Sequence, residues 1–154
     1  MNSSRETWFM WSSDGCIPRE VENYLSRGYN RINGALRKGE TTREVAAIDN
    51  FIYDRGDNIQ GRVFYRSVNP VELSLSEQRG FLSVSESTRA ALFSARGRVT
   101  ARVVALDNVM GVDIASMAPE RHVEAEFLLQ RNLMTIYDSS ANTLFLKAGD
   151  NELL

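Results

Sequence analysis

The pattern of apolar residues changes once along the chain, near Gly61, and this change limits the folds open to it. Before Gly61, apolar residues recur every three or four positions, as they do in amphipathic helices. After Gly61, short stretches rich in β-branched and aromatic residues alternate with Gly, Pro, Asn and Asp, as strands and turns do. Helices followed by strands predict an α+β domain rather than a parallel sheet with alternating helices.

Two helical segments are expected before this change. The first covers Ile17–Gly39, and we expect Gly28 to divide it in two. Thr41 and Glu44 have the spacing of a capping box, in which a threonine hydroxyl and a glutamate three positions later bond to the backbone at the helix start. They predict a second helix over Thr42–Tyr53.

Seven strands and one short helix are expected after Gly61, from the spacing of the β-rich stretches. The expected strands are Arg62–Val68, Gly80–Ser85, Arg98–Leu106, Val112–Ala115, Glu124–Gln130, Met134–Tyr137 and Thr143–Lys147, and the helix lies near Ser87–Ser94.

Size and composition exclude several classes of protein. The 154 residues fit a single domain, and 43% hydrophobic with 25% charged residues is typical of a soluble globular chain. No apolar run approaches the roughly 20 residues that cross a bilayer. A net charge of -2 lacks the basic excess of nucleic-acid-binding proteins. One cysteine, Cys16, and one histidine, His122, exclude an internal disulfide and a Cys/His zinc site, so we expect no metal.

Glu124 and Glu126 form an acidic pair in a predicted strand. The strand period of two would place both carboxylates on one face. There, one could stabilise positive charge at a sugar carbon while the other accepts a proton from a nucleophile. The alternative is an ordinary half-exposed strand, in which acidic and apolar residues also alternate.

Two other strands carry polar side chains that could join this pair. Arg66 lies in an otherwise apolar and aromatic stretch, where an unpaired guanidinium would be costly to bury. It could bind a diphosphate or carboxylate, or form an internal ion pair. Ser83 and Ser85 share a strand face and could orient a carboxylate or a ribose, although a half-exposed strand would show the same alternation.

An arginine in an aromatic strand, then GFLSVS, then EAE followed by apolar residues, resembles the Arg-Ser-Glu class of ADP-ribosyltransferases. This class includes enzymatic components of bacterial binary toxins, Rho-modifying exoenzymes and phage-encoded transferases. Tyr29–Arg37 is similar to the family's Y..IN..LR helix, and Gly111–Ile114 to the strand before its recognition loop. The resemblance implies a helical N-terminal flank packed on two roughly perpendicular, mainly antiparallel sheets, with NAD bound in the cleft between them.

The resemblance also implies which residues bind NAD. Arg66 takes the position that contacts the NAD phosphates, and Ser67 a neighbouring position whose backbone can hold the nicotinamide amide. Asn33 and Arg37 are further NAD contacts from the helix. Ser67 departs from the glycine that many relatives have there.

The chemistry that the resemblance implies centres on the acidic pair. Ser83 helps to position Glu126, which holds the ribose 2′-hydroxyl and stabilises the oxocarbenium-like transition state. Glu124 engages the acceptor, and a Glu at this position is associated with arginine acceptors. Val84 replaces the threonine of the family's serine-threonine-serine motif. The loop Ser116–Val123, at the place of the acceptor-recognition loop, lacks the aromatic residue often found there.

From these features we expect a monomeric NAD-dependent mono-ADP-ribosyltransferase that modifies an arginine of a target protein and releases nicotinamide. The alternatives are an NAD glycohydrolase, with water as acceptor, and a catalytically silent binding module. Family habits suggest a phage-delivered enzyme or an injected bacterial effector. The protein would then be soluble and act in the cytoplasm of a host or target cell, without a membrane or nucleic-acid partner.

Overall fold

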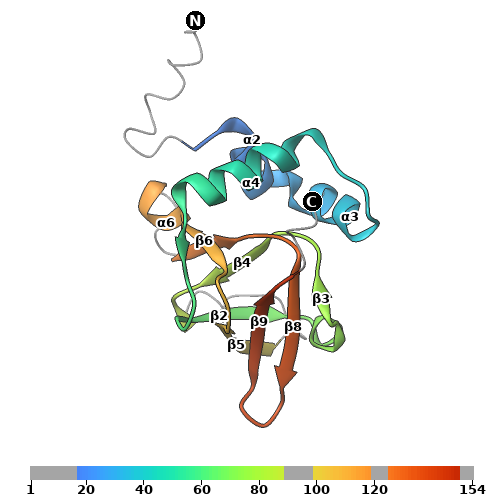
Figure 1. Cartoon of the computed structure of the whole chain (residues 1–154), viewed down its shortest axis with the longest axis vertical. Helices are drawn as coiled ribbons and strands as arrows, with labels where there is room; N and C mark the ends of the chain where they lie inside the picture. The colour runs from blue at the N-terminus through green and yellow to red at the C-terminus, as the bar shows by residue number, and fades with distance from the viewer. Residues whose placement is uncertain (1–16, 89–98, 119–124, 150–154) are drawn as a thin grey trace, which may run out of the picture.

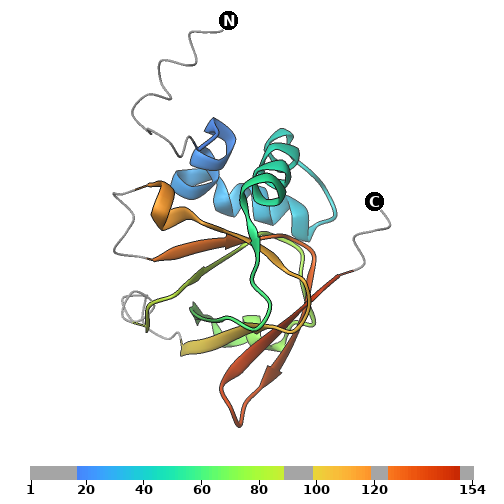
Figure 2. The ribbon, with the colours of Figure 1, turned by 60° about the vertical axis from the view of Figure 1, so that its left-hand side comes forward.

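The computed structural model describes residues 17–88, 99–118 and 125–149 (Figure 1). Three N-terminal helices, α2 (Arg19–Asn23), α3 (Tyr29–Arg37) and α4 (Arg43–Arg55), pack together as a layer. The strands lie on one side of this layer in both ribbon views (Figure 2). The predicted helical N-terminal flank is confirmed.

The first helical stretch continues from α2 to α3 through a π-helical turn, Tyr24–Gly28. Gly28 keeps a helical backbone, with φ −85° and ψ −7°, so the expected division there is a change of helix type and not a break. A Cβ at this position would lie 3.1 Å from the carbonyl oxygen of Asn23. The missing side chain therefore lets the wider turn close without a clash.

Helix α4 confirms the second predicted helix, but the predicted capping box is wrong. Thr42 is the N-cap residue and makes no side-chain cap hydrogen bond. Glu44 turns instead toward α3, where its carboxylate accepts hydrogen bonds from Arg31 Nη2 at 2.7 Å and Nη1 at 3.3 Å. A guanidinium offers two parallel donors, which a backbone N–H does not, and this favours the interhelical pair. The hydrogen bonds from Arg31 lower the pKa of Glu44 from 4.5 to about 2.

We expect Glu44→Gln to lower the melting temperature at pH 7 by a few degrees, because the charged partner of Arg31 is lost. A lowered folded-state pKa stabilises the protein above the unfolded-state value, and this contribution disappears as the pH falls from 4.5 to about 2. The difference between wild type and variant should therefore shrink across that window in thermal unfolding followed by circular dichroism. Glu40→Gln, at an exposed position, is the control. A difference that is the same at pH 2 and pH 7 would contradict this role of the pair.

The strands form one hydrogen-bonded sheet in the order β1-β6-β7-β4-β2-β5-β9-β8-β3. Neighbouring strands are antiparallel, apart from the parallel pair β5 and β9, which confirms the mainly antiparallel prediction. The strands are β1 (Asp57–Asn58), β2 (Val63–Val68), β3 (Glu77–Gln78), β4 (Leu82–Ser85), β5 (Val99–Ala105), β6 (Met110–Asp113), β7 (Glu126–Leu129), β8 (Leu133–Asp138) and β9 (Thr143–Ala148).

A narrow junction between β4 and β2 joins the two halves of this sheet. One half holds β1, β6, β7 and β4, and the other holds β2, β5, β9, β8 and β3. Across the junction only Tyr65 and Ser85 are in register as partners among the described residues. By contrast, β2 and β5 pair along six positions. So short a junction leaves each half free to take its own direction, as expected for two sheets that meet at an angle.

Some elements differ from the sequence prediction. The strand expected over Val112–Ala115 ends at Asp113, whose side chain accepts a hydrogen bond from Ser116 N at 3.1 Å and caps the short helix α6 (Ile114–Met117). The pattern missed the two-residue strands β1 and β3 and a short 3-10 helix, Pro70–Ser74, which are too brief to show a periodicity. Most of the helix expected near residues 87–94 lies outside the described residues.

Two buried clusters hold these layers together. One fills the space between helices and sheet and includes Ile32, Ile48 and Leu128. The other, which includes Phe64 and Leu129, packs strands of the two halves against one another. Strand β7 contributes to both clusters and is buried along its whole length. Glu126, the one polar residue of β7, is therefore shielded from solvent together with the rest of the strand.

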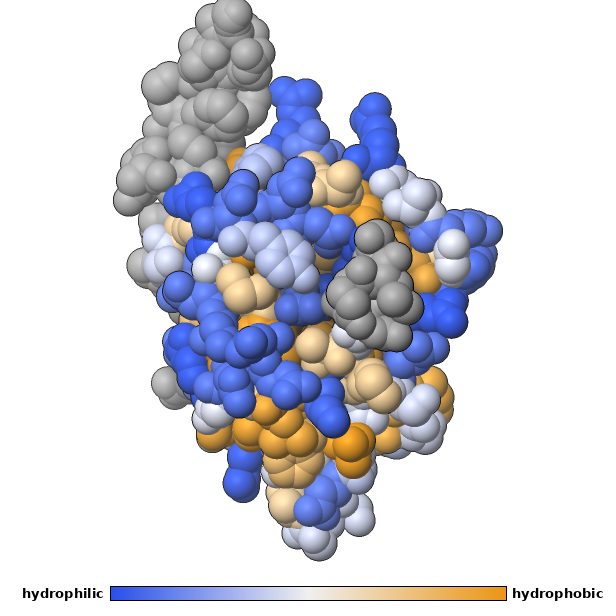
Figure 3. Space-filling model, viewed as in Figure 1, coloured by the Kyte–Doolittle hydropathy of each residue, from blue (hydrophilic) through white to orange (hydrophobic). Residues whose placement is uncertain are grey.

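The surface over the helices is mainly hydrophilic, whereas apolar side chains gather lower on the same face (Figure 3). In the sheet, Val63, Val104, Phe145 and Ile136 lie in consecutive register across four strands. The ends of this row, Val63 and Ile136, are exposed.

None of the helices in the described ranges is long and apolar enough to cross a membrane.

Candidate active site

The three segments singled out in the sequence lie on adjacent strands. Arg66 and Ser67 belong to β2, Ser83 to β4 and Glu126 to β7, and the sheet order places β4 between the other two. Because neighbouring strands lie about 4.8 Å apart, residues distant in sequence come within side-chain reach of one another here. The fold therefore brings the predicted arginine, serine and glutamate together.

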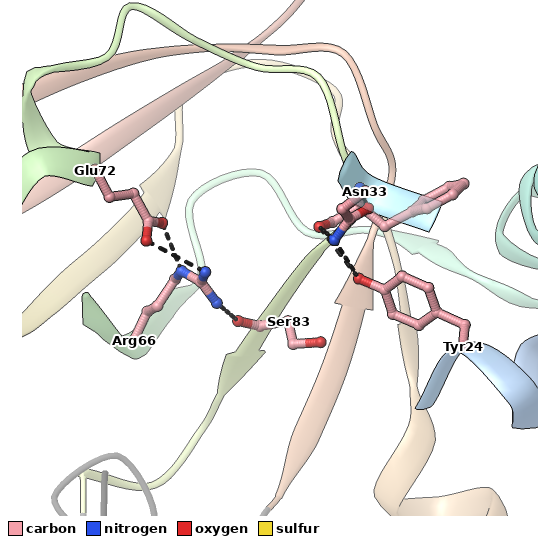
Figure 4. Close-up of polar contacts among 6 residues, drawn as sticks. Tyr24, Asn33, Arg66, Glu72 and Ser83 are labelled. Carbon is pink, nitrogen blue, oxygen red and sulfur yellow. Dashed lines mark hydrogen bonds and ion pairs between the residues drawn. The ribbon is translucent and has the colours of Figure 1, made fainter. Parts of the chain in front are cut away.

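Arg66 is held on two sides (Figure 4). Its Nε donates to Glu72 Oε2 at 2.8 Å and its Nη2 to Glu72 Oε1 at 3.4 Å. Its Nη1 donates to the backbone carbonyl of Ser83 at 2.8 Å. The partner expected for this guanidinium is thus the carboxylate of Glu72. Through its bond to Ser83, Arg66 also connects β2 to β4 close to their narrow junction.

Glu126 is the first residue of β7, and only 8% of it is exposed. Ser85 lies directly opposite Glu126 in the register, while Ser83 lies opposite Leu128, two positions further along the same face. Leu82 and Val84 point into the core from the other face, as the alternation predicts. Ser85, which the sequence analysis grouped with Ser83, is therefore the direct neighbour of Glu126 on β4. That Ser83 positions Glu126 stays a prediction.

The strand that holds Glu126 does not include the residue before it, Ala125. Ala125 has φ 46°, in the left-handed region that non-glycine residues seldom adopt, and β7 begins only after it. Its carbonyl oxygen accepts a hydrogen bond from Glu86 N at 3.1 Å, which holds this conformation next to the end of β4. The strand expected over Glu124–Gln130 thus begins later, at Glu126, and the face that Glu124 would share with Glu126 stays a prediction. Glu124 itself, like His122, lies outside the described residues.

We expect Ala125→Val to destabilise the fold by about 1–2 kcal/mol, because a β-branched side chain is strained at positive φ. Ala125→Gly should leave stability nearly unchanged, since glycine adopts this conformation freely but loses more entropy on folding. Urea unfolding of the two variants measures the difference. Equal stability of the valine and glycine variants would show that the left-handed conformation is not kept in solution.

Asn33 binds the backbone at the start of β4 as a strand partner would (Figure 4). Its Oδ1 accepts from Phe81 N at 2.9 Å, and its Nδ2 donates to the Phe81 carbonyl at 3.2 Å and to Tyr24 Oη at 2.9 Å. A Cβ on residue 80 would lie only 2.5 Å from Asn33 Oδ1, so the glycine there permits the close approach. Because its amide is already engaged, the predicted contact of Asn33 with NAD stays a prediction without support from this geometry.

The hydroxyl of Tyr24 lies beside Asn33 and the backbone of Phe81. Burial raises the pKa of Tyr24 from 10.0 to about 12, and the negative charge of Glu126 acts in the same direction. The hydrogen bond from Asn33 and the positive charges of Arg66 and Arg37 lower this pKa, and burial outweighs them. Tyr24 is thus neutral at physiological pH and can donate to the Phe81 carbonyl, at 3.3 Å, while it accepts from Asn33.

Arg37 lies in the last turn of α3 and is exposed. Its carbonyl oxygen accepts a hydrogen bond from Arg79 Nη1 at 3.3 Å. Its predicted contact with NAD stays a prediction. Glu72 and Tyr24 were missed as site residues because their positions follow from the tertiary fold and carry no motif.

We expect Asn33→Ala to lower the free energy of unfolding by about 2 kcal/mol, because the Phe81 N–H loses its acceptor and the Phe81 carbonyl keeps only the hydrogen bond from Tyr24. Asn30→Ala, at an exposed position of the same helix, should change it by less than about 0.5 kcal/mol. Urea unfolding compares the two variants. A loss of stability in Asn33→Ala no larger than that in Asn30→Ala would contradict the role of Asn33 in holding the start of β4.

Comparison with known proteins gives no family model and no curated protein that matches the sequence. Solved structures do match. The chain superposes on BECa, an ADP-ribosylating toxin of Clostridium perfringens solved with NADH, with TM-score 0.62 and 17% identity over 95% of this chain and 47% of BECa. It superposes on the C3 exoenzyme of Clostridium limosum with TM-score 0.60 and 15% identity over 94% and 91% of the two chains. It superposes on the Vibrio splendidus ADP-ribosyltransferase Vis, solved with agmatine, with TM-score 0.51 and 18% identity over 94% of this chain and 81% of Vis.

The chain has the ADP-ribosyltransferase fold. This confirms the fold predicted from the resemblance, at identities of 15% and 17%. The chain spans about half the length of BECa but nearly all of the C3 exoenzyme. The ADP-ribosyltransferase fold thus holds Arg66, Ser83 and Glu126 on three adjacent strands, β2, β4 and β7.

Proposed function

We propose that this protein is an NAD-dependent mono-ADP-ribosyltransferase that transfers ADP-ribose from NAD to an arginine of a target protein. The observation that carries the proposal is the meeting of Arg66, Ser83 and Glu126 on adjacent strands of an ADP-ribosyltransferase fold. BECa, which has this fold, was solved with NADH. An arginine and a buried carboxylate in one site match the charges that NAD presents in the reaction. The arginine is opposite in charge to the diphosphate, and the carboxylate is opposite in charge to the cation that develops on the sugar.

In the proposed complex, Arg66 binds the NAD phosphates, and the backbone at Ser67 holds the nicotinamide amide. Arg37 adds a second positive charge on the helical side of the site. Two cations near a diphosphate strengthen its binding, and a guanidinium adds directional hydrogen bonds to the phosphate oxygens. Asn33 contributes through Phe81, by holding the start of β4 beside the nicotinamide ribose.

Glu126 stabilises the transition state. The bond between the nicotinamide nitrogen and ribose C1′ breaks, nicotinamide leaves with the electron pair, and positive charge develops at C1′ and the ring oxygen. The carboxylate of Glu126, which is buried in β7, stabilises this charge and accepts a hydrogen bond from the ribose 2′-hydroxyl. Ser83 and Ser85, on the same face of β4, orient this carboxylate.

Glu124 prepares the acceptor. A guanidinium nitrogen of the target arginine attacks C1′ from the side opposite the leaving group, and Glu124 takes up the proton that this nitrogen loses. A protonated guanidinium is a poor nucleophile, so a carboxylate that orients it and removes its proton is a chemical requirement. Vis was solved with agmatine, a small guanidinium compound, which makes agmatine a suitable probe.

The test is nicotinamide release from NAD by the purified protein, with and without agmatine. We expect agmatine to accelerate release, and Glu126→Gln to reduce it by at least about 100-fold, because one electrostatic contact with the transition state is lost. Glu124→Gln should keep the basal release and lose the acceleration. Glu86→Gln, at an exposed position just after β4, is the control and should behave as wild type.

Release that agmatine does not change would favour NAD glycohydrolase activity or another acceptor. Absence of both NAD binding and nicotinamide release would contradict the enzyme and leave a binding module on this fold. Activity that survives in Glu126→Gln would contradict the assigned role of this carboxylate.

A further inference from the structure

We propose that Glu72 is a positioning residue that fixes the guanidinium of Arg66 for the NAD phosphates. This inference rests on the proposed function and adds a residue that the sequence motifs do not include. Glu72 holds Nε and Nη2 of Arg66, and the Ser83 carbonyl holds Nη1. A guanidinium has five N–H donors, so one N–H on Nη1 and one on Nη2 remain for phosphate oxygens.

The chain around Glu72 is itself held in place. Asn69 caps the 3-10 helix Pro70–Ser74, with its Oδ1 accepting from Val71 N at 3.0 Å. Pro70 fixes the backbone at the first helical position. Glu72 N donates to the Asn69 carbonyl at 2.8 Å, and the Glu72 carbonyl accepts from Leu75 N at 3.2 Å. Both backbone groups of Glu72 are therefore engaged, and its side chain starts from a fixed point.

The pair is also shielded from solvent. The side chain of Glu72 is 17% exposed and that of Arg66 is 22% exposed. By contrast, the pair of Glu77 with Arg79 joins side chains that are 57% and 46% exposed, at 3.2 Å. A shielded pair with two hydrogen bonds holds its geometry better than an exposed one with a single bond. This difference makes Glu77 a suitable control for the loss of one carboxylate.

The charge of Glu72 and its geometry predict opposite effects on NAD. A carboxylate near a phosphate site repels the phosphates, so if Glu72 acted through its charge, or merely competed for Arg66, its removal would strengthen NAD binding. If Glu72 positions Arg66, its removal frees the guanidinium to turn and weakens binding. The direction of the change therefore separates the two roles.

The experiment is calorimetric titration of the full chain with NAD. We expect Glu72→Gln to raise the dissociation constant about tenfold, because a freely rotating guanidinium loses its bidentate alignment. Glu72→Asp keeps the charge but shortens the side chain, and it should also weaken binding. Glu77→Gln should bind as wild type. Saturating NAD should largely restore the rate of nicotinamide release in Glu72→Gln, since Glu72 does not touch the reacting atoms.

A double-mutant cycle tests whether Glu72 acts through Arg66. Arg66→Lys has no fork to align, so adding Glu72→Gln to it should weaken binding little further. An undiminished effect of Glu72→Gln in that background would overturn the inference, as would unchanged or tighter binding by Glu72→Gln alone. If wild type binds no NAD, the proposed function fails; if wild type binds and Glu72→Gln binds equally well, only the role of Glu72 fails.

Discussion

Strand β4 depends on side chains for its place, because one register pair joins it to β2. Asn33 completes the hydrogen bonding at its start, through both backbone groups of Phe81. Arg66 binds its middle, through the carbonyl of Ser83. Pairing with β7 along four positions holds its other edge. These contacts connect the helical layer and both halves of the sheet at the strand that carries the predicted serine.

This arrangement gives Arg66 two tasks that share one geometry. Its contact with Ser83 helps to hold the two halves of the sheet together, and its contact with Glu72 fixes the plane of the guanidinium. A lysine has only three N–H donors and no planar fork, so it would have none left for an anion after three such contacts, which is a physical reason for arginine at this position. The structural reading and the anion-binding reading of Arg66 are therefore compatible, because a guanidinium has donors enough for both.

Local patterns in the sequence predicted most of the elements, because apolar periodicity and turn residues act over short distances. They placed helix α4 and strands β2, β5, β8 and β9 to within about two residues, the usual uncertainty of element ends. They also indicated that Arg66 needs a partner. The partner itself, Glu72, lies on a 3-10 helix too short to show a period, and the pairing of Glu44 with Arg31 depends on how two helices pack. Such contacts follow from tertiary structure and leave no local pattern.

The strand that the sequence pattern predicts for the acidic pair begins only at Glu126, because the backbone at Ala125 is not extended. Glu126 lies in the buried strand β7, where its backbone pairs with Ser85 of β4. Ala125, one residue earlier, already has a left-handed backbone and lies outside the ladder. The carboxylate proposed to act on NAD is thus fixed by the sheet, whereas the orientation of the preceding residue is not set by strand geometry. Among the described residues, Ala125 takes part in no register pair of β7 with β4 or β6, so the pairing that fixes Glu126 does not depend on the conformation of Ala125.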